Sequence, residues 1–142
     1  MTAQTAPSTT PIPTPQSRKA NIALWTLQII TAGMFLMGAV IKLTASAGSV
    51  ESFDQIGFGG WFLYFIGAAE LAGGIGLLVP RLTGLAALSL TALMIGAVIT
   101  EVVVFGGGMV IAPIVALACV ATIAWGRRQS TAALVQLLRE RG

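Results

Sequence analysis

Histidine is absent from this sequence, and cysteine occurs once, at Cys119. A disulfide within the chain, a Cys-x-x-Cys redox centre and a haem held by histidine are therefore excluded. Charged residues are also scarce, at 9% of the chain against roughly 25% in a soluble domain. The sequence contains no phosphate-binding loop, metal-ligand cluster or nucleophilic triad, so we expect no metal or covalent cofactor. We also do not expect the chain to be a complete enzyme on its own.

Apolar residues are abundant instead. They make up 56% of the 142 residues, and the mean hydropathy is +0.89. Such a chain must turn most of its surface toward lipid or toward other helices. The net charge of +3 and the pI of about 9.8 would suit a nucleic-acid-binding protein. That class is excluded because the basic residues flank apolar runs and do not form a patch interleaved with aromatic residues.

Four apolar runs are each long enough, or nearly so, to cross a bilayer as a helix. They predict an all-α integral membrane four-helix bundle over residues 20–128, with helices at about 22–43, 61–79, 82–104 and 109–125. Ala45-Ser46-Ala47 resembles a signal-peptide cleavage site, but the first run exceeds the 7–15 residues usual for a signal peptide. We therefore predict a retained helix.

The segments outside these runs are more polar. Residues 1–19 are rich in Ser, Thr and Pro, which predicts a disordered tail. Residues 44–60 fit either a short amphipathic turn on the membrane surface or a plain loop. Residues 129–142 place Leu134, Leu137 and Leu138 on one face, which predicts an amphipathic tail helix.

Basic residues fall on one side of this four-helix topology. The loops at 44–60 and 105–108 contain none, whereas the termini and the 80–81 turn carry every basic residue except Lys42. By the positive-inside rule, both termini are predicted to be cytoplasmic, in a multi-pass protein of the bacterial cytoplasmic membrane.

Glu70 is the most informative residue because it lies in the middle of the second apolar run. An ionisable side chain at that depth is costly to bury, so a functional role is the default hypothesis, and a structural hydrogen bond is the alternative. Gly67 and Gly74 share its helical face, and Gly73 is adjacent. Glycines at such spacing predict close helix packing.

Two further polar stripes follow helical spacing. Gln28, Thr31 and Lys42 share one face of the first helix, and Thr91 and Glu101 share one face of the third. Because lipid does not solvate polar groups, we expect both stripes to face the bundle interior. Thr31, Thr91 and Gln28 thus join Glu70 as candidates for ligand binding or proton exchange.

Lys42 and Glu101 are predicted to lie near the outer face of the membrane, close enough to pair with each other. In that case they would form an outer gate above Glu70. The alternative for both residues is ordinary snorkelling to the membrane interface. Cys119, without a partner base, is predicted to be a small packing residue.

The pattern resembles the DoxX and DoxX-like family of small four-helix bacterial membrane proteins. The specific part is Phe62-x-x-Phe65-Ile66-Gly67-x-x-Glu70-Leu71-x-Gly73-Gly74-x-Gly76-Leu77-Leu78-x-Pro80. Leu24-Trp25-x-Leu27-Gln28, Phe35-Leu36-x-x-Gly38, Lys42-Leu43 and Met94-x-Gly96-Ala97 extend the similarity over about residues 21–126. The resemblance implies a four-helix membrane bundle that is linked to redox work, since one branch supplies a membrane subunit of a thiosulfate–quinone oxidoreductase.

The resemblance favours an accessory membrane subunit of a redox system, with a quinone or similar lipid-soluble molecule near Glu70. Its implied partners are the lipid bilayer and either a soluble oxidoreductase or further copies of the chain. One alternative is a carrier of small molecules or lipids, in which the polar interior is a passage. Another is a structural scaffold whose glycine faces dock partner helices.

Overall fold

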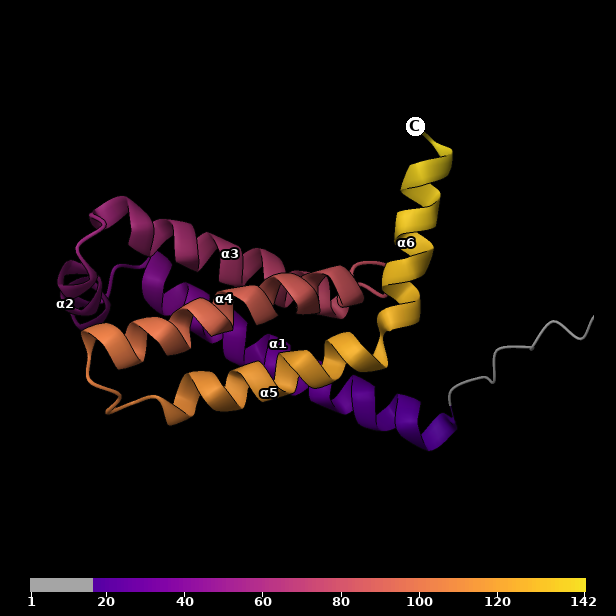
Figure 1. Cartoon of the computed structure of the whole chain (residues 1–142), viewed down its shortest axis with the longest axis horizontal. Coiled ribbons are helices and arrows are strands. Elements are labelled where there is room, and N and C mark those ends of the chain that lie inside the picture. The colour runs from indigo at the N-terminus through magenta and orange to yellow at the C-terminus, as the bar shows by residue number, and fades with distance from the viewer. Residues whose placement is uncertain (1–16) are drawn as a thin grey trace, which may run out of the picture.

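The computed structural model describes residues 17–142, which form an all-α structure of six helices joined by short turns (Figure 1). The helices are α1 (Arg18–Leu43), α2 (Ala47–Ile56), α3 (Gly60–Leu78), α4 (Thr83–Val104), α5 (Ile111–Gly126) and α6 (Arg128–Glu140). The predicted disordered tail lies outside the described residues except at its last positions.

At those last positions the prediction was wrong, because Arg18 and Lys19 belong to α1 and not to the tail. The Ser17 hydroxyl accepts a hydrogen bond from the Ala20 amide at 3.2 Å and so caps the helix at this point. The other three long helices begin and end within two residues of their predicted limits. Helix termini fray, so differences of this size carry no structural meaning.

Residues 44–60, for which a surface turn and a loop were both open, contain the helix α2. Gly57 ends it with φ of +83°, a left-handed conformation that glycine adopts without strain. Phe53 of α2 contacts Phe62 of α3, with ring centroids 5.7 Å apart. The helix therefore lies against one end of the bundle.

The bundle consists of α1, α3, α4 and α5, in which α1 packs along α3, α3 on α4 and α4 on α5. Glycines permit the closest approaches. A Cβ at Gly73 would lie 2.5 Å from the Leu90 side chain, and one at Gly74 would lie 3.1 Å from Leu36. One at Gly67 would lie 3.1 Å from Lys42. Each of these glycines is buried where α3 contacts another helix.

The apolar core fills the half of the bundle nearer α6, and all four long helices contribute to it. Its members include Ala32, Phe35, Leu77, Leu90, Val120 and Ile123. The outer surface is apolar as well: Met37 is 68% exposed and Val103 is 76% exposed. In water such a surface would be unfavourable, whereas lipid tails solvate it.

Three helices, α1, α3 and α4, are long and apolar enough to cross a membrane. α5 has 16 residues, which corresponds to about 24 Å at ~1.5 Å per residue and is short for a hydrocarbon core of about 30 Å. It counts as a fourth span when it is joined to Thr131–Glu140 of α6, from which it bends by 59°. The described chain thus has three to four candidate spans, and its fold is that of a multi-pass membrane protein.

Candidate functional site

The predicted site residue Glu70 forms an ion pair with Lys42. The Lys42 ammonium lies 3.0 Å from Oε2 and 3.1 Å from Oε1 of Glu70, so it donates to both carboxylate oxygens. Only 8% of the Glu70 side chain and 21% of the Lys42 side chain are exposed. A pair of this kind inside an apolar bundle is stable because each charge compensates the other; either charge alone would be costly.

This pairing corrects two expectations about Lys42. It pairs with Glu70 and not with Glu101, and it lies beside Gly67, about two turns inside α3, rather than level with the end of α3 that adjoins α2. Its Cβ lies beside Gly67, which is about 10 Å along α3 from Gly60 at ~1.5 Å per residue. The sequence-based estimate of depth counted residues inward from the end of each helix, as if all helix ends were level. They are not level, because α1 is longer than its neighbours and extends beyond them at the α6 end.

Glu101 has a local structural contact instead. Its Oε1 accepts a hydrogen bond from the Met109 amide at 2.8 Å, across the turn that joins α4 to α5. Gly106 and Gly107 in this turn have φ of +72° and +83°, so glycine is required there. The Glu101 carboxylate thus stabilises a tight turn that has no basic residue nearby in the sequence.

A cavity of about 470 Å³ lies next to the ion pair, within the size range of small-molecule sites. α2 covers one end of it with Phe53 and Ile56. Four polar side chains line it, those of Lys42, Glu70, Thr100 and Glu101. The remaining wall is apolar or glycine, and comprises Phe62, Ile66, Ala92, Leu93, Met94, Gly96, Ala97, Phe105 and Pro113 besides the two α2 residues.

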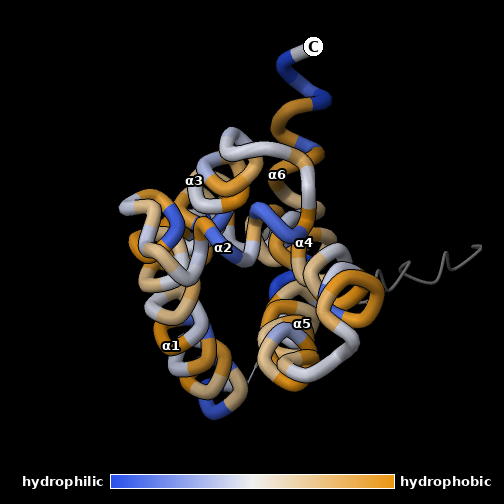
Figure 2. Tube along the Cα trace, turned by 90° about the vertical axis from the view of Figure 1, so that its left-hand side faces the viewer, coloured by the Kyte–Doolittle hydropathy of each residue, from blue (hydrophilic) through white to orange (hydrophobic). Residues whose placement is uncertain are grey.

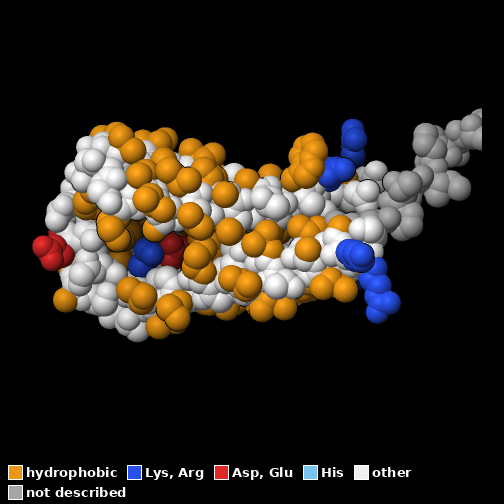
Figure 3. All heavy atoms as spheres, turned by 90° about the horizontal axis from the view of Figure 1, so that it is seen from below, with side chains coloured by type: hydrophobic (Ala, Val, Ile, Leu, Met, Phe, Trp, Pro, Cys, Tyr) orange, Lys and Arg blue, Asp and Glu red, His pale blue; other side chains and the backbone are white. Residues whose placement is uncertain are grey.

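The cavity opens sideways, toward the surface that faces lipid. Figure 2 shows α1 and α5 apart at the α2 end, and Figure 3 looks onto the side of the molecule where these two helices lie. A basic and an acidic side chain are visible there at the floor of a hollow, and apolar side chains form its rim. A molecule dissolved in the bilayer can therefore approach the cavity without crossing a polar barrier.

The ion pair retains capacity for a further ligand. An ammonium group has three donor hydrogens, and Lys42 uses two of them on Glu70. The two carboxylate oxygens of Glu70 have lone pairs beyond those that Lys42 occupies. The site can therefore donate one hydrogen bond and accept others from a molecule in the cavity.

The other predicted site residues lie elsewhere. Gln28 is fully buried, donates to the Leu77 carbonyl at 2.9 Å and accepts from Arg127 Nε at 2.7 Å. Thr91 donates to the Ala87 carbonyl of its own helix at 2.7 Å. Thr31 is 1% exposed, and its hydroxyl has no hydrogen-bond partner among residues 17–142. None of the three lines the cavity, so the polar stripes do not form one continuous interior.

Arg127 holds the opposite end of the bundle closed, a role that the sequence did not indicate. Besides Gln28, its guanidinium binds Asn21 Oδ1 at 2.9 Å and lies 5.5 Å from the Trp25 ring centroid. Partial burial lowers the pKa of Arg127 from its usual value, although a guanidinium stays charged at physiological pH. A Cβ at Gly126 would lie 2.7 Å from Leu24, so α1 and α5 are in tight contact here.

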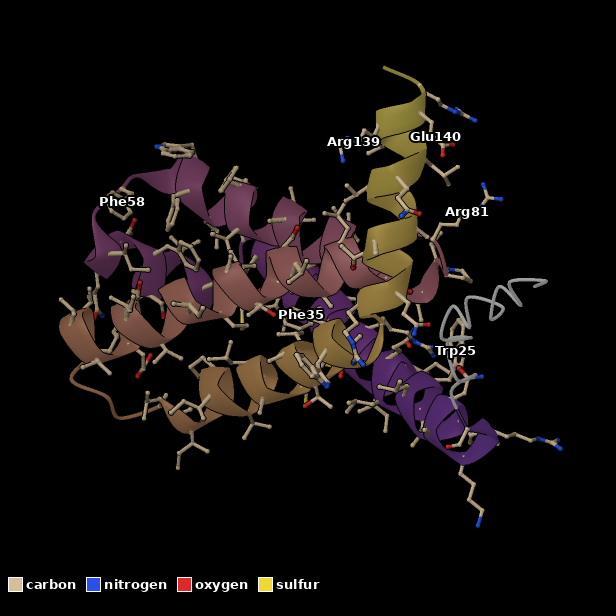
Figure 4. All side chains as sticks on the ribbon, turned by 45° about the vertical axis from the view of Figure 1, so that its right-hand side comes forward. Trp25, Phe35, Phe58, Arg81, Arg139 and Glu140 are labelled. Carbon is tan, nitrogen blue, oxygen red and sulfur yellow. The ribbon has the colours of Figure 1, made fainter. Side chains whose placement is uncertain are left out.

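Charge is distributed unequally between the two ends. In Figure 4, Arg81 and Arg139 lie at the end where α6 crosses the bundle, Phe58 lies at the opposite end, and Phe35 lies between them. Arg18 and Lys19 begin α1, and Arg127 lies between α5 and α6, so these three residues belong to the α6 end. The α2 end carries Glu51 and Asp54. Among residues 17–142, no three His, Cys, Asp or Glu side chains are grouped as metal ligands.

The structure is therefore that of a multi-pass α-helical membrane protein. It has apolar spans, a short core between them and an ion pair beside a lipid-facing cavity. The family model described as the DoxX-like family matches residues 26–123. The chain therefore belongs to the DoxX-like family, as its sequence pattern predicts. No curated protein and no solved structure matches it.

Proposed function

We propose that this protein is an accessory membrane subunit of a redox system and that it binds a quinone or a related lipid-soluble molecule in the cavity beside Lys42 and Glu70. The observation that carries the proposal is a buried ion pair in the wall of a mostly apolar cavity that opens toward lipid. A few polar groups within an apolar lining are typical of sites that orient a small molecule.

The donor and acceptor groups of the site match the two redox states of such a ligand. A quinone carbonyl oxygen accepts hydrogen bonds, and the free ammonium hydrogen of Lys42 can supply one. A quinol hydroxyl donates, and a Glu70 carboxylate oxygen can accept. The apolar wall suits the ring and its tail. The chain itself contributes binding and orientation, and electrons would come from a partner enzyme.

The two alternative functions have less support. A carrier needs a passage through the bundle, but the half nearer α6 is filled by the apolar core and closed by Arg127 and Gln28. A scaffold that docks partners on its glycine faces needs those faces free. Gly67, Gly73 and Gly74 are instead buried against helices of this chain.

The proposed location is the bacterial cytoplasmic membrane, with both termini in the cytoplasm. The basic residues at the α6 end support this orientation, because basic segments are retained on the cytoplasmic side. Four crossings by α1, α3, α4 and α5 would also leave both termini on one side. The cavity would then lie in the half of the membrane that faces away from the cytoplasm.

The ligand is tested by measuring how much of a short-tailed quinone the purified protein retains in lipid nanodiscs. The test variant is Lys42→Met with Glu70→Leu, which removes both charges together and so leaves neither unpaired. The matched control is Lys19→Met with Glu51→Leu, which removes the same two charge types from exposed positions. We expect the control to retain the quinone. Retention by the test variant should fall about tenfold or more, because one charge-assisted hydrogen bond contributes about that much to affinity. Equal retention by both variants would refute a site at the ion pair.

The partner is tested by affinity isolation of the tagged protein from its native membrane in mild detergent, followed by mass spectrometry. We expect a soluble oxidoreductase in stoichiometric amount. Isolation of the protein alone, without quinone or enzyme, would refute the accessory-subunit role.

A further inference from the structure

α6 has an apolar stripe that the protein covers only at one end. Thr131, Leu134 and Leu138 follow steps of three and four residues, and Val135 and Leu137 flank them. Leu138 is 64% exposed, and Val135 is 57% exposed. Gln129 and Glu140 lie on the opposite side of the helix, whereas Arg139, four residues after Val135, lies at the edge of the stripe. An amphipathic helix with its apolar side uncovered is incomplete in water.

Contacts of the stripe show which way it faces. The Thr131 side chain lies directly over Gly84 near the start of α4, where a Cβ would collide with it. At Thr131, therefore, the stripe faces the end of the bundle. Leu138 continues the same line about two turns further along α6. The C-terminal part of α6 extends past the bundle in Figure 1. Because lipid surrounds the bundle, the part of α6 that extends sideways faces the bilayer with the same stripe.

The charges around α6 indicate the kind of bilayer surface. Arg128, Arg139 and Arg141 belong to α6 or adjoin it, and Glu140 is the one acid among its described residues. Arg128 borders a groove of about 740 Å³ between α4, α5 and α6, which Leu88 and Val135 also line. Its guanidinium carbon lies 4.6 Å from the centroid of Trp125, an aromatic residue suited to the membrane interface.

We propose that α6 is an interfacial helix that binds anionic phospholipids of the leaflet beneath it. The apolar stripe enters the boundary between head groups and acyl chains, and the arginines contact the phosphates. The charge of these arginines supports an anionic lipid as the occupant, and so does the direct continuation of α5, a membrane-embedded helix, into α6. This inference does not depend on the quinone site, which lies at the other end of the bundle.

Cysteine labelling in nanodiscs tests it. Cys119 is first changed to Ala, which leaves no native thiol. Leu138→Cys then places a thiol on the stripe, and Glu140→Cys places one on the opposite face of the same helix. In nanodiscs that contain phosphatidylglycerol, a charged maleimide should label Leu138→Cys at least about tenfold more slowly than Glu140→Cys. This protection should be weaker in nanodiscs of phosphatidylcholine alone. It should also be weaker in a protein that carries Arg139→Gln and Arg141→Gln. The expected decrease is about fivefold for each arginine that contacts the anionic leaflet, since each such contact is worth about 1 kcal/mol.

Equal labelling rates at the two positions in phosphatidylglycerol would overturn the proposal. Protection that is identical in phosphatidylcholine and survives the loss of both arginines would overturn the role of anionic lipid. A Leu138→Cys protein that is labelled freely in nanodiscs but protected in native membranes would show that a protein covers the stripe, which also overturns it.

Discussion

Removing one partner of the Lys42–Glu70 pair should cost much more stability than removing both. Two opposite charges about 4 Å apart attract by about 4 kcal/mol at an effective dielectric constant of about 20. Much of this attraction offsets the cost of taking both charges out of water, so the net value of the pair is small. Replacement of both residues by apolar side chains, Lys42→Met with Glu70→Leu, should therefore change the free energy of unfolding by about 1 kcal/mol or less.

The two single variants should differ from each other because the two side chains differ in exposure. Lys42→Met leaves the Glu70 carboxylate, 8% exposed, without its partner, and should cost about 3 kcal/mol. Glu70→Leu leaves the Lys42 ammonium, and the Lys42 side chain is 21% exposed on a long flexible stem. That group can turn toward water, so the cost should be smaller, about 1–2 kcal/mol.

The assay is reversible unfolding in mixed detergent micelles with increasing dodecyl sulfate, followed by circular dichroism, for all four proteins of the cycle. The expected interaction energy is about 3 kcal/mol or more, because the sum of the single losses exceeds the loss of the double variant. A double variant whose loss equals that sum would refute the reasoning. The two charges would then act independently, and the pair would not be the polar element that organises the cavity.

Three further variants test particular contacts. Gly38→Ala should reduce quinone retention with little loss of stability, because the new Cβ would lie 3.0 Å from Glu70 Oε2 and displace the carboxylate. Gly73→Ala should lower the free energy of unfolding by about 1–3 kcal/mol in the same micelle assay, because its Cβ would lie 2.5 Å from Leu90. Arg127→Lys should cost about 1–3 kcal/mol, because a lysine cannot reproduce the forked contacts that close the α6 end.

Each of these has a matched control in the chain. A Cβ at Gly33, which does not line the cavity, would meet nothing within 4 Å, so alanine at this position should be neutral or slightly stabilising. Arg128→Lys controls for Arg127→Lys, since Arg128 is exposed and its one hydrogen bond within the described chain is to the Trp125 carbonyl. Effects as large in the controls as in the test variants would contradict the assigned contacts.

The long helices were predictable because membrane spans need uninterrupted apolar runs and the bilayer imposes their length. Close packing at the glycines could also be expected from the sequence, since Gly67 and Gly74 share the face of Glu70 and small residues mark close helix packing. α2 was harder to predict, because ten residues of mixed polarity adopt a helix here through contact with the end of the bundle.

The partner of Glu70 could not be predicted from spacing alone. Helical periodicity shows which residues share a face, but it does not fix how far one helix is shifted along another. Counting from the helix ends placed Lys42 level with Glu101, and a shift between α1 and α3 brings it to Glu70 instead. The contacts of Arg127 span 99 and 106 residues of sequence, so no local pattern contains them.

The separation of α1 and α5 near α2 affects how ligand binding should be measured. If the cavity is entered from lipid, the relevant ligand concentration is the one in the bilayer and not the one in water. Each additional methylene group favours the membrane by about 0.8 kcal/mol, so a longer tail raises the local concentration several-fold without a new protein contact. Apparent affinities for ligands that share a head group should thus increase with tail length, and they should become similar once each is divided by its partition coefficient. A modest intrinsic affinity would then suffice to keep the site filled.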